Sequence, residues 1–364
     1  MRTLVVSDLH LGGRTGVDVL RDPAAREPLL EQAARADRLV LLGDTLELRH
    51  GPVREALRGA APALLALGAA LDASTEVVLV PGNHDHALAT PWLDGRHSPL
   101  GTETRIRPAT ASPIARRLAG WLGQGGAPVE VAYPGLWLRD DVYATHGHYM
   151  DPHGTVPTFE RLGAGAMLRM AGGLPDPAAA EDYERILVPI YAWIHAAAQR
   201  TAEGKLGVGA GRAGRAYEML TGDGHRPVRM RALAAAFPLG IRGLNLLGIG
   251  PLSSDLSGAA LRRNALLGMG EVIARLGIGA EHVIFGHSHR TGPLPSDDLL
   301  EWRTAGGAWL YNSGSWVHEP WFTGTARTAS PYWPGGAIVV EDGDAPPQLL
   351  RLLGGELSPA PDPA

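Results

Sequence analysis

The stretch Gly82-Asn83-His84-Asp85-His86 decides how the rest of the chain is interpreted. It follows the apolar, β-branched run at residues 76–80, which ends at the breaker pair Pro81-Gly82. Four consecutive apolar residues bounded by such a pair predict a buried strand. The strand therefore delivers an amide, an imidazole and a carboxylate at its carboxyl end.

Four other apolar runs end in the same way, at residues 3–7, 38–42, 141–145 and 281–285. The turns that follow these runs are Asp8-Leu9-His10, Gly43-Asp44, His146-Gly147 and Gly286-His287-Ser288-His289. Singly, such residues are more often helix caps, turn residues or surface histidines. Together they predict one site, because open α/β sheets build their sites at the carboxyl ends of strands.

The length, net charge and cysteine content of the chain exclude several classes of partner and site. The 364 residues exceed one typical domain, so we expect either one large domain with an insertion or two domains. The 33 basic and 38 acidic residues give a net charge of −5, which argues against a protein whose main partner is a nucleic-acid backbone. The absence of cysteine excludes disulfides, thiolate metal sites and thiol nucleophiles. Any metal must therefore be held by His, Asp, Glu, Asn or water.

The amino terminus and the apolar runs bear on location. The first strand begins at residue 3 and leads into Asp8, so cleavage of a signal peptide would remove part of the site. We therefore expect a cytoplasmic protein. No uninterrupted apolar run reaches about 18 residues, so no membrane-spanning helix is expected.

Helical and strand patterns alternate in the first third of the chain. Residues 23–36 and 52–71 carry apolar residues at helical spacing, which predicts helices that cover a layered α/β sheet. Residues 114–122 predict a short helix. Residues 308–317 and 337–341 predict antiparallel strands of a second sheet.

The segment 151–255 has a different character, with helical patterns and little strand signal. One apolar stripe at i, i+3, i+4 spacing consists of Tyr183, Ile186, Leu187, Ile190, Ile194 and Ala198. Residues 226–247 mix arginines with apolar residues. They are interpreted either as part of a cap that packs its apolar face on itself or as a basic amphipathic surface that contacts lipid or an acyl chain. Residues 256–276 predict a helix that leads back to the core.

The polar groups at the strand ends form a typical ligand set for metal ions. They are Asp8, His10, Asp44, Asn83, His146, His287 and His289, with His84 and Asp85 beside them. Carboxylates mixed with imidazoles suit divalent Mn, Fe, Co or Zn. Seven ligands are too many for one ion, whereas two ions that share a carboxylate need about this number. Such pairs lie ~3.5–4 Å apart in enzymes that displace a leaving group at phosphorus.

The five turns, in this order, resemble the five motifs of the calcineurin-like metallophosphoesterase superfamily. The resemblance covers residues 1–150 and 256–345. It implies a four-layer α/β/β/α sandwich. From the residue pattern, 151–255 is then a helical insertion or cap, and 346–364 a C-terminal strand and loose tail. It also implies one ion held by Asp8, His10, Asp44 and His289, and a second held by Asp44, Asn83, His146 and His287. Asp44 would then bridge the two ions.

The implied activity is phosphoester hydrolysis, in which a hydroxide between two metal ions attacks phosphorus in line. His84 is expected to donate to the phosphate and to protonate the departing oxygen, and Asp85 to orient His84. The His-Gly pattern of the family favours His146 over His148 as a ligand. Arg14 and Arg290 lie next to ligands in the sequence and are candidate phosphate-binding residues.

The substrate is less clearly indicated, because the superfamily includes phosphomonoesterases, phosphodiesterases, pyrophosphohydrolases and nucleases. We expect the insertion to set substrate choice. A helical insertion after the same motif is similar to that of UDP-2,3-diacylglucosamine pyrophosphohydrolases, where it shapes an acyl pocket. A lipid-linked or nucleotide pyrophosphate is therefore one candidate, although that family usually has Arg where this chain has His84.

Two alternatives belong to different classes. A Mn-dependent nuclease of the same superfamily would be expected to have a basic groove, and the negative net charge of the chain argues against a nuclease. A non-catalytic scaffold would keep the fold without the metals, and the presence of every ligand residue argues against it.

Overall fold

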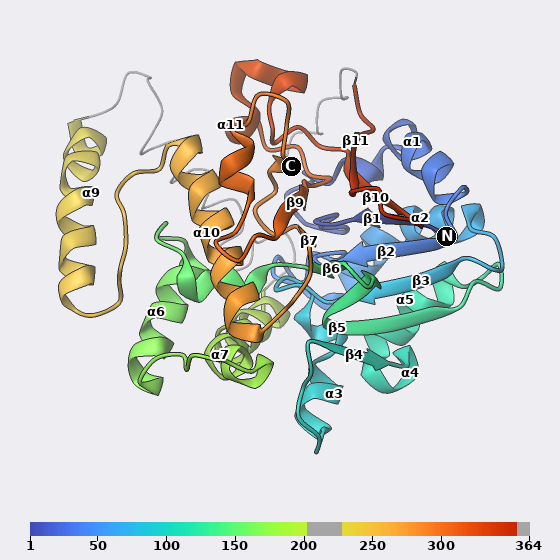
Figure 1. Ribbon diagram of the computed structural model, residues 1–364, viewed down its shortest axis with the longest axis horizontal. Helices are drawn as coiled ribbons and strands as arrows, with labels where there is room; N and C mark the ends of the chain where they lie inside the picture. Colours follow the sequence, from blue (N-terminus) through green and yellow to red (C-terminus); the bar gives the residue numbers. More distant parts are fainter. Residues whose placement is uncertain (202–227, 355–364) are drawn as a thin grey trace.

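The computed structural model describes residues 1–201 and 228–354. An 11-stranded sheet forms its centre, with the strand order β11-β10-β1-β2-β3-β5-β6-β7-β9-β8 and with β4 paired to β5 (Figure 1). The strands are β1 (Arg2–Val6), β2 (Arg38–Leu42), β3 (Glu76–Val80), β4 (Glu103–Ile106), β5 (Val129–Arg139), β6 (Val142–Thr145), β7 (His282–Phe285), β8 (Thr291–Gly292), β9 (Trp309–Ser313), β10 (Gly336–Glu341) and β11 (Gln348–Arg351).

The long strand β5 joins two groups of parallel strands. Strands β1, β2 and β3 are parallel neighbours, and β6, β7 and β9 form a second parallel group. Residues 129–131 of β5 pair with β3 in parallel, whereas residues 135–139 pair with β6 in an antiparallel register. Pro134 lies between these two segments and Gly135 begins the second, so the two residues interrupt the alternating pattern, and β5 was not predicted from the sequence.

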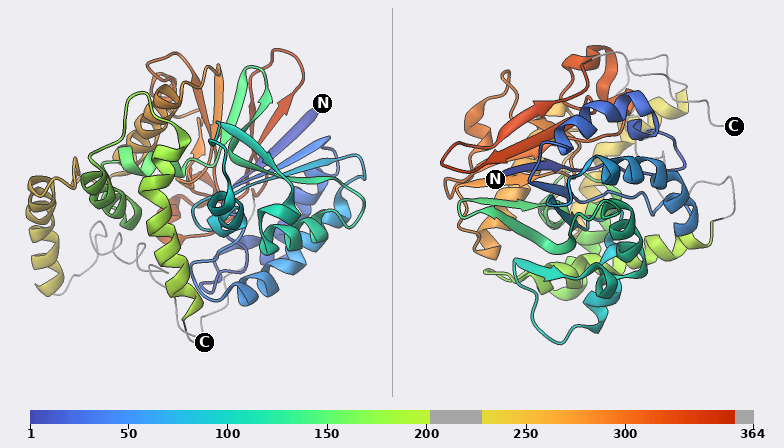
Figure 2. Two further views of the ribbon diagram at one scale, coloured as in Figure 1. Left: turned by 90° about the horizontal axis from the view of Figure 1, so that it is seen from below. Right: turned by 90° about the vertical axis from the view of Figure 1, so that its right-hand side faces the viewer.

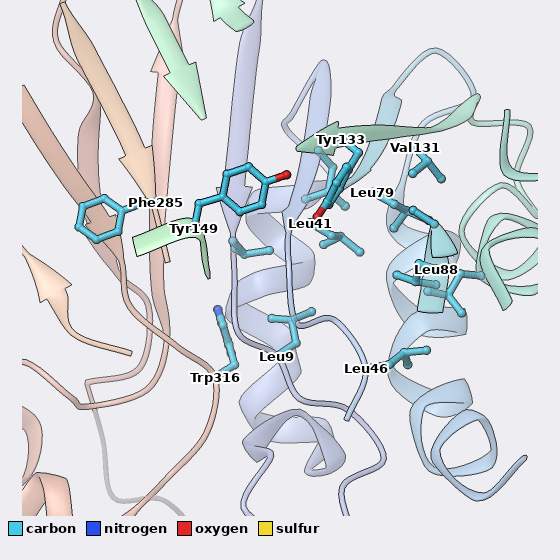
Figure 3. Close-up of a cluster of buried hydrophobic side chains, with 14 of the residues drawn as sticks. Leu9, Leu41, Leu46, Leu79, Leu88, Val131, Tyr133, Tyr149, Phe285 and Trp316 are labelled. Carbon is cyan, nitrogen blue, oxygen red and sulfur yellow. The ribbon is translucent and has the colours of Figure 1, made fainter. Parts of the chain in front are cut away.

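The two faces of the sheet are buried in different ways. One apolar cluster joins Leu41 and Leu79 of the strands to helix residues such as Leu64. Figure 3 shows part of this cluster, with Leu41, Leu79 and Val131 from three strands. The other cluster holds the alternate residues, such as Val40 and Val78, and consists only of strand residues. This second face is therefore covered by other strands of the same sheet, which must curve on itself.

Helices α1 (Pro23–Ala33), α2 (Val53–Ala70) and α5 (Pro113–Leu122) confirm the three helices expected from apolar spacing in the first third. Two shorter helices, α3 (Thr90–Gly95) and α4 (Pro108–Ala111), lie between α2 and α5 in the chain. Helix α1 begins where the side chain of Asp22 accepts a hydrogen bond from the Ala24 amide. Such a carboxylate satisfies one of the free amides of the first turn.

The later helices are α6 (Phe159–Ala171), α7 (Ala180–Gln199), α9 (Val228–Leu246), α10 (Gly258–Leu276) and α11 (Pro320–Thr323). The apolar stripe predicted within α7 is buried along its whole length, from Tyr183 to Ala198. Helices α6, α7 and α10 lie on one side of the sheet, and α9 stands further out in both Figure 1 and Figure 2. The division into a core at 1–150 and 256–345 and an insertion at 151–255 stays a prediction.

The expected second sheet is not found, and this changes how the expected sandwich is described. The strands at 308–317 and 337–341 do not form a second sheet, because β9 pairs with β7 in parallel and β10 pairs with β1 in an antiparallel register. They extend the same sheet at two different places. The four-layer sandwich is therefore not present as two separate hydrogen-bonded sheets, although the curved sheet buries an inner face made only of strands.

The predicted amphipathic segment at 226–247 is described only in part. Residues 226 and 227 lie outside the described residues, and so do the side chains up to residue 235. In the remainder of α9, Leu239 and Leu246 are exposed and Ile241 is buried. No helix in the described ranges has both the length and the apolar character needed to cross a bilayer.

Candidate metal centre

The turns after the strands have an unusual backbone conformation. Six non-glycine residues in the described ranges have a positive φ, and five of these are predicted metal ligands. They are Asp8 (54°), His10 (45°), Asp44 (51°), His287 (65°) and His289 (57°). A left-handed non-glycine residue costs on the order of 1–3 kcal/mol and persists only where the surrounding structure enforces it. This concentration of strain indicates a functional site.

Glycines in the motifs allow the turns to approach one another. Gly43 has a φ of 85°, and a Cβ atom there would overlap the imidazole of His146. A Cβ atom on Gly286 would overlap the Asp8 carboxylate. These contacts bring together residues that are more than 100 positions apart, so only glycine fits between the ligands.

The first ligand group consists of Asp8, His10 and His289. The Nε2 atoms of His10 and His289 face each other at 3.1 Å, and His289 Nε2 is 3.4 Å from Asp8 Oδ1. Asp8 Oδ1 is buried and has no hydrogen-bond partner among the described residues. Lone-pair atoms that converge in this way fit a cation between them.

The second group consists of Asp44, Asn83, His146 and His287. Asn83 Oδ1 lies 3.1 Å from His146 Nε2 and 3.1 Å from His287 Nδ1. Asp44 Oδ2 is 3.3 Å from His146 Nε2. Rotating the Asn83 amide would place its NH2 group toward these atoms and its oxygen 2.8 Å from Arg49 Nη2. A cation would select the orientation with Oδ1 inward, because it needs an oxygen donor.

The outer ring nitrogen of each histidine is fixed by an oxygen atom. The pairs are His10 Nδ1 with Glu47 Oε2 at 3.1 Å, His146 Nδ1 with Leu42 O at 3.0 Å, His287 Nε2 with Asp151 Oδ1 at 2.8 Å, and His289 Nδ1 with Glu319 Oε2 at 3.5 Å. An imidazole that donates one N–H outward keeps the lone pair of its other nitrogen for the metal. The residues present therefore fit divalent cations at both groups.

Known proteins add one decisive comparison. Residues 1–179 match the family described as Calcineurin-like phosphoesterase. Residues 1–179 are therefore identified as a calcineurin-like metallophosphoesterase region. This match implies metal-dependent phosphoester hydrolysis. The match ends before the Gly286-His287-Ser288-His289 turn, which joins the site through a 3.0 Å hydrogen bond from the His287 amide to Asp8 Oδ2.

Other comparisons with known proteins give less information. A search of curated proteins gives no match. One solved structure similar to the chain is a cold-active protein-tyrosine phosphatase of a psychrophile Shewanella species, with 12% identity and a TM-score of 0.28. The similarity covers 94% of this chain and 75% of the other. A TM-score this low supports no conclusion about fold or activity.

Charges in the metallophosphoesterase site keep its carboxylates ionised. Burial alone would raise the pKa of Asp8, but His146 and His289 outweigh it and lower this pKa to about 2. Burial alone would also raise the pKa of Asp44, but His146 and His84 outweigh it and hold this pKa well below its usual value. Both carboxylates are therefore available as ligands at neutral pH.

His84 lies at the open side of the site and has 24% of its side chain exposed. Its Nδ1 atom is 2.7 Å from Glu47 Oε2, and its Nε2 atom is 3.3 Å from Arg49 Nη1 and 4.0 Å from Asp44 Oδ2. Because Glu47 holds Nδ1, the Nε2 atom is the one directed toward the predicted metals. Burial and then Arg49 lower the pKa of His84.

Asp85 does not orient His84, in contrast to the sequence expectation. Its carboxylate accepts hydrogen bonds from the amides of Gly82, Asp44, Thr45 and Leu46, at 2.7 to 3.2 Å. Sequence adjacency was misleading because Asp85 points into the turn that carries Asp44, while His84 points outward. Asp85 therefore fixes the position of Asp44, and Glu47 takes the role expected of Asp85.

The two arginines predicted to bind phosphate have other carboxylate partners. Arg14 pairs with Glu55 at 2.6 Å. Arg290 is buried, pairs with Asp297 at 2.5 Å and lies over the ring of Trp302. The structure brings neither arginine into the two ligand groups. Arg290 in particular is neutralised by Asp297, which explains its burial.

Sequence reasoning missed the residues that support the ligands from outside: Glu47, Arg49, Asp151 and Glu319. Glu47 and Arg49 could have been noticed, because they are charged residues that alternate with Leu46 and Leu48 directly after Gly43-Asp44. No spacing signal identified Asp151 or Glu319. Arg49 is buried, donates to the Asn83 carbonyl at 3.0 Å and pairs with Glu160 of α6 at 2.5 Å.

Proposed function

We propose that this protein is a phosphoester hydrolase that uses two divalent cations. The observation that carries the proposal is the position of Asp44 Oδ2, which is 3.7 Å from His10 Nε2 and 3.3 Å from His146 Nε2. One carboxylate oxygen thus reaches both ligand groups. Asp44 would bridge two ions, one held with Asp8, His10 and His289 and the other with Asn83, His146 and His287.

The ligand set favours Mn, Fe, Co or Zn, since it combines carboxylates and imidazoles without thiolate. When bound, such ions lower the pKa of water from ~15.7 toward ~7 and neutralise charge on phosphoryl oxygens. Water activated in this way can attack phosphorus in line. The remaining steps are assigned to residues of the chain itself.

His84 would protonate the departing oxygen. Glu47 fixes its Nδ1 atom, so Nε2 faces the site, and the negative charge of a bound phosphoester would favour the imidazolium form that can give up the Nε2 proton. Arg49, which Glu160 and the Asn83 carbonyl hold with its Nη1 3.3 Å from His84 Nε2, would position His84 toward the ester. A positioned general acid contributes about 10²- to 10⁴-fold to the rate.

The segment after His146 would set substrate choice. Asp151 contacts His287, and Glu160 contacts Arg49, so this segment provides acidic groups beside the second ligand group. Glu319 adds a third carboxylate next to His289. These charges disfavour a polyanionic substrate such as DNA and favour a small phosphoester over the nuclease alternative. A lipid-linked or nucleotide pyrophosphate, membrane contact through 226–247 and a cytoplasmic location remain predictions.

The proposal is tested with a chromogenic aryl phosphate, its bis-ester and single-stranded DNA, each with and without chelator. We expect ester hydrolysis that chelator abolishes and Mn²⁺ restores. His84→Ala should keep two metal ions per chain and lose about 10²- to 10⁴-fold in turnover. His97→Ala, at an exposed position in the loop after α3, is the matched control and should behave like the wild type. Hydrolysis that is insensitive to chelator, or no hydrolysis of any ester, would contradict the proposal.

A further inference from the structure

Exposed apolar side chains gather toward the carboxyl ends of helices α6 and α9. We call the following residues the basic apolar patch: Met170, Leu239, Leu246, Leu247, Arg169 and Arg242. The apolar members are 61% to 85% exposed, and both arginines are exposed as well. Single exposed apolar residues are common on soluble proteins, but several at one place indicate an interaction surface.

The chain that follows α9 packs along α6 and brings the two helix ends together. Arg161 Nη1 in α6 donates to the Ile249 carbonyl at 3.1 Å. One helical region further along, a Cβ atom on Gly248 would overlap the guanidinium of Arg169. Leu247 directly precedes this close approach in the sequence. The apolar residues at the ends of α6 and α9 therefore belong to one surface.

Helix α9 contributes one of its faces to the patch. Leu239, Arg242 and Leu246 are spaced i, i+3 and i+7, so they lie on the same side of the helix. The end of the helix is held in place by Asn245, which exchanges hydrogen bonds of 2.7 and 3.0 Å with the backbone of Leu252. Because α9 stands away from the sheet in Figure 1 and Figure 2, this face is open to a partner.

The charge of the patch is opposite to that of the whole chain. The chain has a net charge of −5, whereas residues 161–175 and 236–254 contain three arginines and no aspartate or glutamate. Arg161 is buried, so the exposed charge comes from Arg169 and Arg242. A local positive surface on an acidic protein turns toward an anionic partner, while the rest of the protein is repelled by it.

Lipid fits this surface better than a second copy of the chain does. In a twofold contact between copies, the same patch would face itself, and its arginines would meet like charges. A bilayer that contains anionic lipid has no such conflict. Leucines on a helix face enter the region of the head groups, and arginines beside them contact the lipid phosphates.

We propose that the basic apolar patch binds the surface of a bilayer that contains anionic lipid. The apolar side chains enter the interface, and Arg169 and Arg242 contact the head groups. Met170 follows Glu160 by ten residues in α6, which is ~15 Å along the helix. The patch is therefore separate from the proposed metal centre, and the inference does not depend on the proposed function.

The test measures binding of the full chain to lipid vesicles by co-flotation. One set of vesicles contains phosphatidylcholine mixed with phosphatidylglycerol, and the other contains phosphatidylcholine alone. We expect binding to the anionic vesicles to be at least about tenfold tighter, because each arginine near an anionic surface contributes about fivefold. Raising the salt concentration should reduce this difference, since salt screens exposed charges.

Apolar substitutions test the contact with the interface. Leu246→Gln combined with Leu247→Gln should weaken binding to the anionic vesicles by at least about tenfold. Leu300→Gln is the matched control, because Leu300 is 78% exposed in the short helix Leu299–Trp302, outside the patch. The control should bind like the wild type.

Charge substitutions test the contact with the head groups. Arg242→Gln should weaken binding to the anionic vesicles by about fivefold, and Arg242→Lys should retain it. Arg54→Gln, at an exposed position of α2 outside the patch, is the control for the loss of one positive charge. All these variants should keep the wild-type melting temperature and rate of aryl phosphate hydrolysis, because the replaced side chains are exposed and are not metal ligands.

The outcomes separate lipid binding from the proposed function. No binding of the wild type to anionic vesicles, equal binding to both kinds of vesicle, or an equal loss in the control variants would overturn the inference. Self-association that the paired leucine variant abolishes, without vesicle binding, would assign the patch to a second copy of the chain and would also overturn it. Chelator should leave vesicle binding unchanged, so vesicle binding without ester hydrolysis would contradict the proposed function alone.

Discussion

Substitution of Glu47 by Gln would test two roles of this residue. Glu47 supports the predicted ligand His10 and the predicted general acid His84. Glu47 Oε2 lies 3.1 Å from His10 Nδ1 and 2.7 Å from His84 Nδ1. Burial raises the pKa of Glu47, but His50 and His84 outweigh it and keep this pKa well below its usual value. Gln keeps the size and one acceptor oxygen while it removes the charge.

The size of the effect follows from these two contacts. A hydrogen bond to a charged group contributes about 1.5–3 kcal/mol, and each ~1.36 kcal/mol is a factor of ten. Removing the outer partner of a metal-binding histidine typically costs about 10- to 100-fold in metal affinity or activity. We therefore expect Glu47→Gln to weaken one metal site by about 10- to 100-fold, through His10. We also expect a loss of about 10- to 100-fold in kcat at saturating metal, through His84.

The assay is a Mn²⁺ titration of binding and turnover with an aryl phosphate. Glu76→Gln is the matched control, because Glu76 pairs with Arg38 at the amino end of β3, away from the metal ligands. The control should keep wild-type metal affinity and kcat. Unchanged kcat in Glu47→Gln at saturating Mn²⁺ would refute the role of Glu47 behind His84, and unchanged metal affinity would refute its role behind His10.

Three further predictions concern positions outside the reacting groups. Gly43→Ala should lower the free energy of unfolding by more than about 1 kcal/mol, because alanine would have to adopt the left-handed backbone conformation and its Cβ atom would overlap His146. Thermal unfolding measures this loss, and an unchanged melting temperature would contradict the prediction. Burial lowers the pKa of His153 from 6.5 to about 4, so the unfolded chain binds protons more readily and stability falls as pH drops from 6.5 to 4. His153→Gln should make this decline shallower by at most about 3 kcal/mol, as measured by denaturant unfolding at pH 7 and pH 4.5; an equal decline in both proteins would contradict it. Arg290→Gln should reduce stability through the unpaired Asp297 and leave KM for an aryl phosphate unchanged, whereas a large rise in KM at unchanged stability would restore the phosphate-binding role expected from the sequence.

Local patterns were sufficient to predict most strands that carry the site. The runs at 38–42 and 76–80 coincide with β2 and β3, because four apolar residues bounded by a turn have few other interpretations. Strand β5 was missed because Pro134 and Gly135 interrupt its alternation. The pairing of β9 with β7 was missed as well, since strand order depends on contacts between distant segments that no local pattern encodes.

The ligands could be predicted because each stands at the end of a strand, whereas their supporting residues could not. Glu47, Asp151 and Glu319 act through tertiary contacts with histidines of other turns. Asp85 was assigned to His84 because the two are adjacent in sequence. Adjacent residues in a turn can point in opposite directions, and the backbone of this turn directs Asp85 toward the amides around Asp44.

The central claim is that one carboxylate, Asp44, joins two ligand groups into a centre for two metal ions. The most direct measurement is a crystal structure of the protein loaded with Mn²⁺, with anomalous scattering used to locate the ions. We predict two peaks, one among Asp8, His10 and His289 and one among Asn83, His146 and His287, with Asp44 in contact with both. A single peak, or ions bound away from Asp44, would contradict the account.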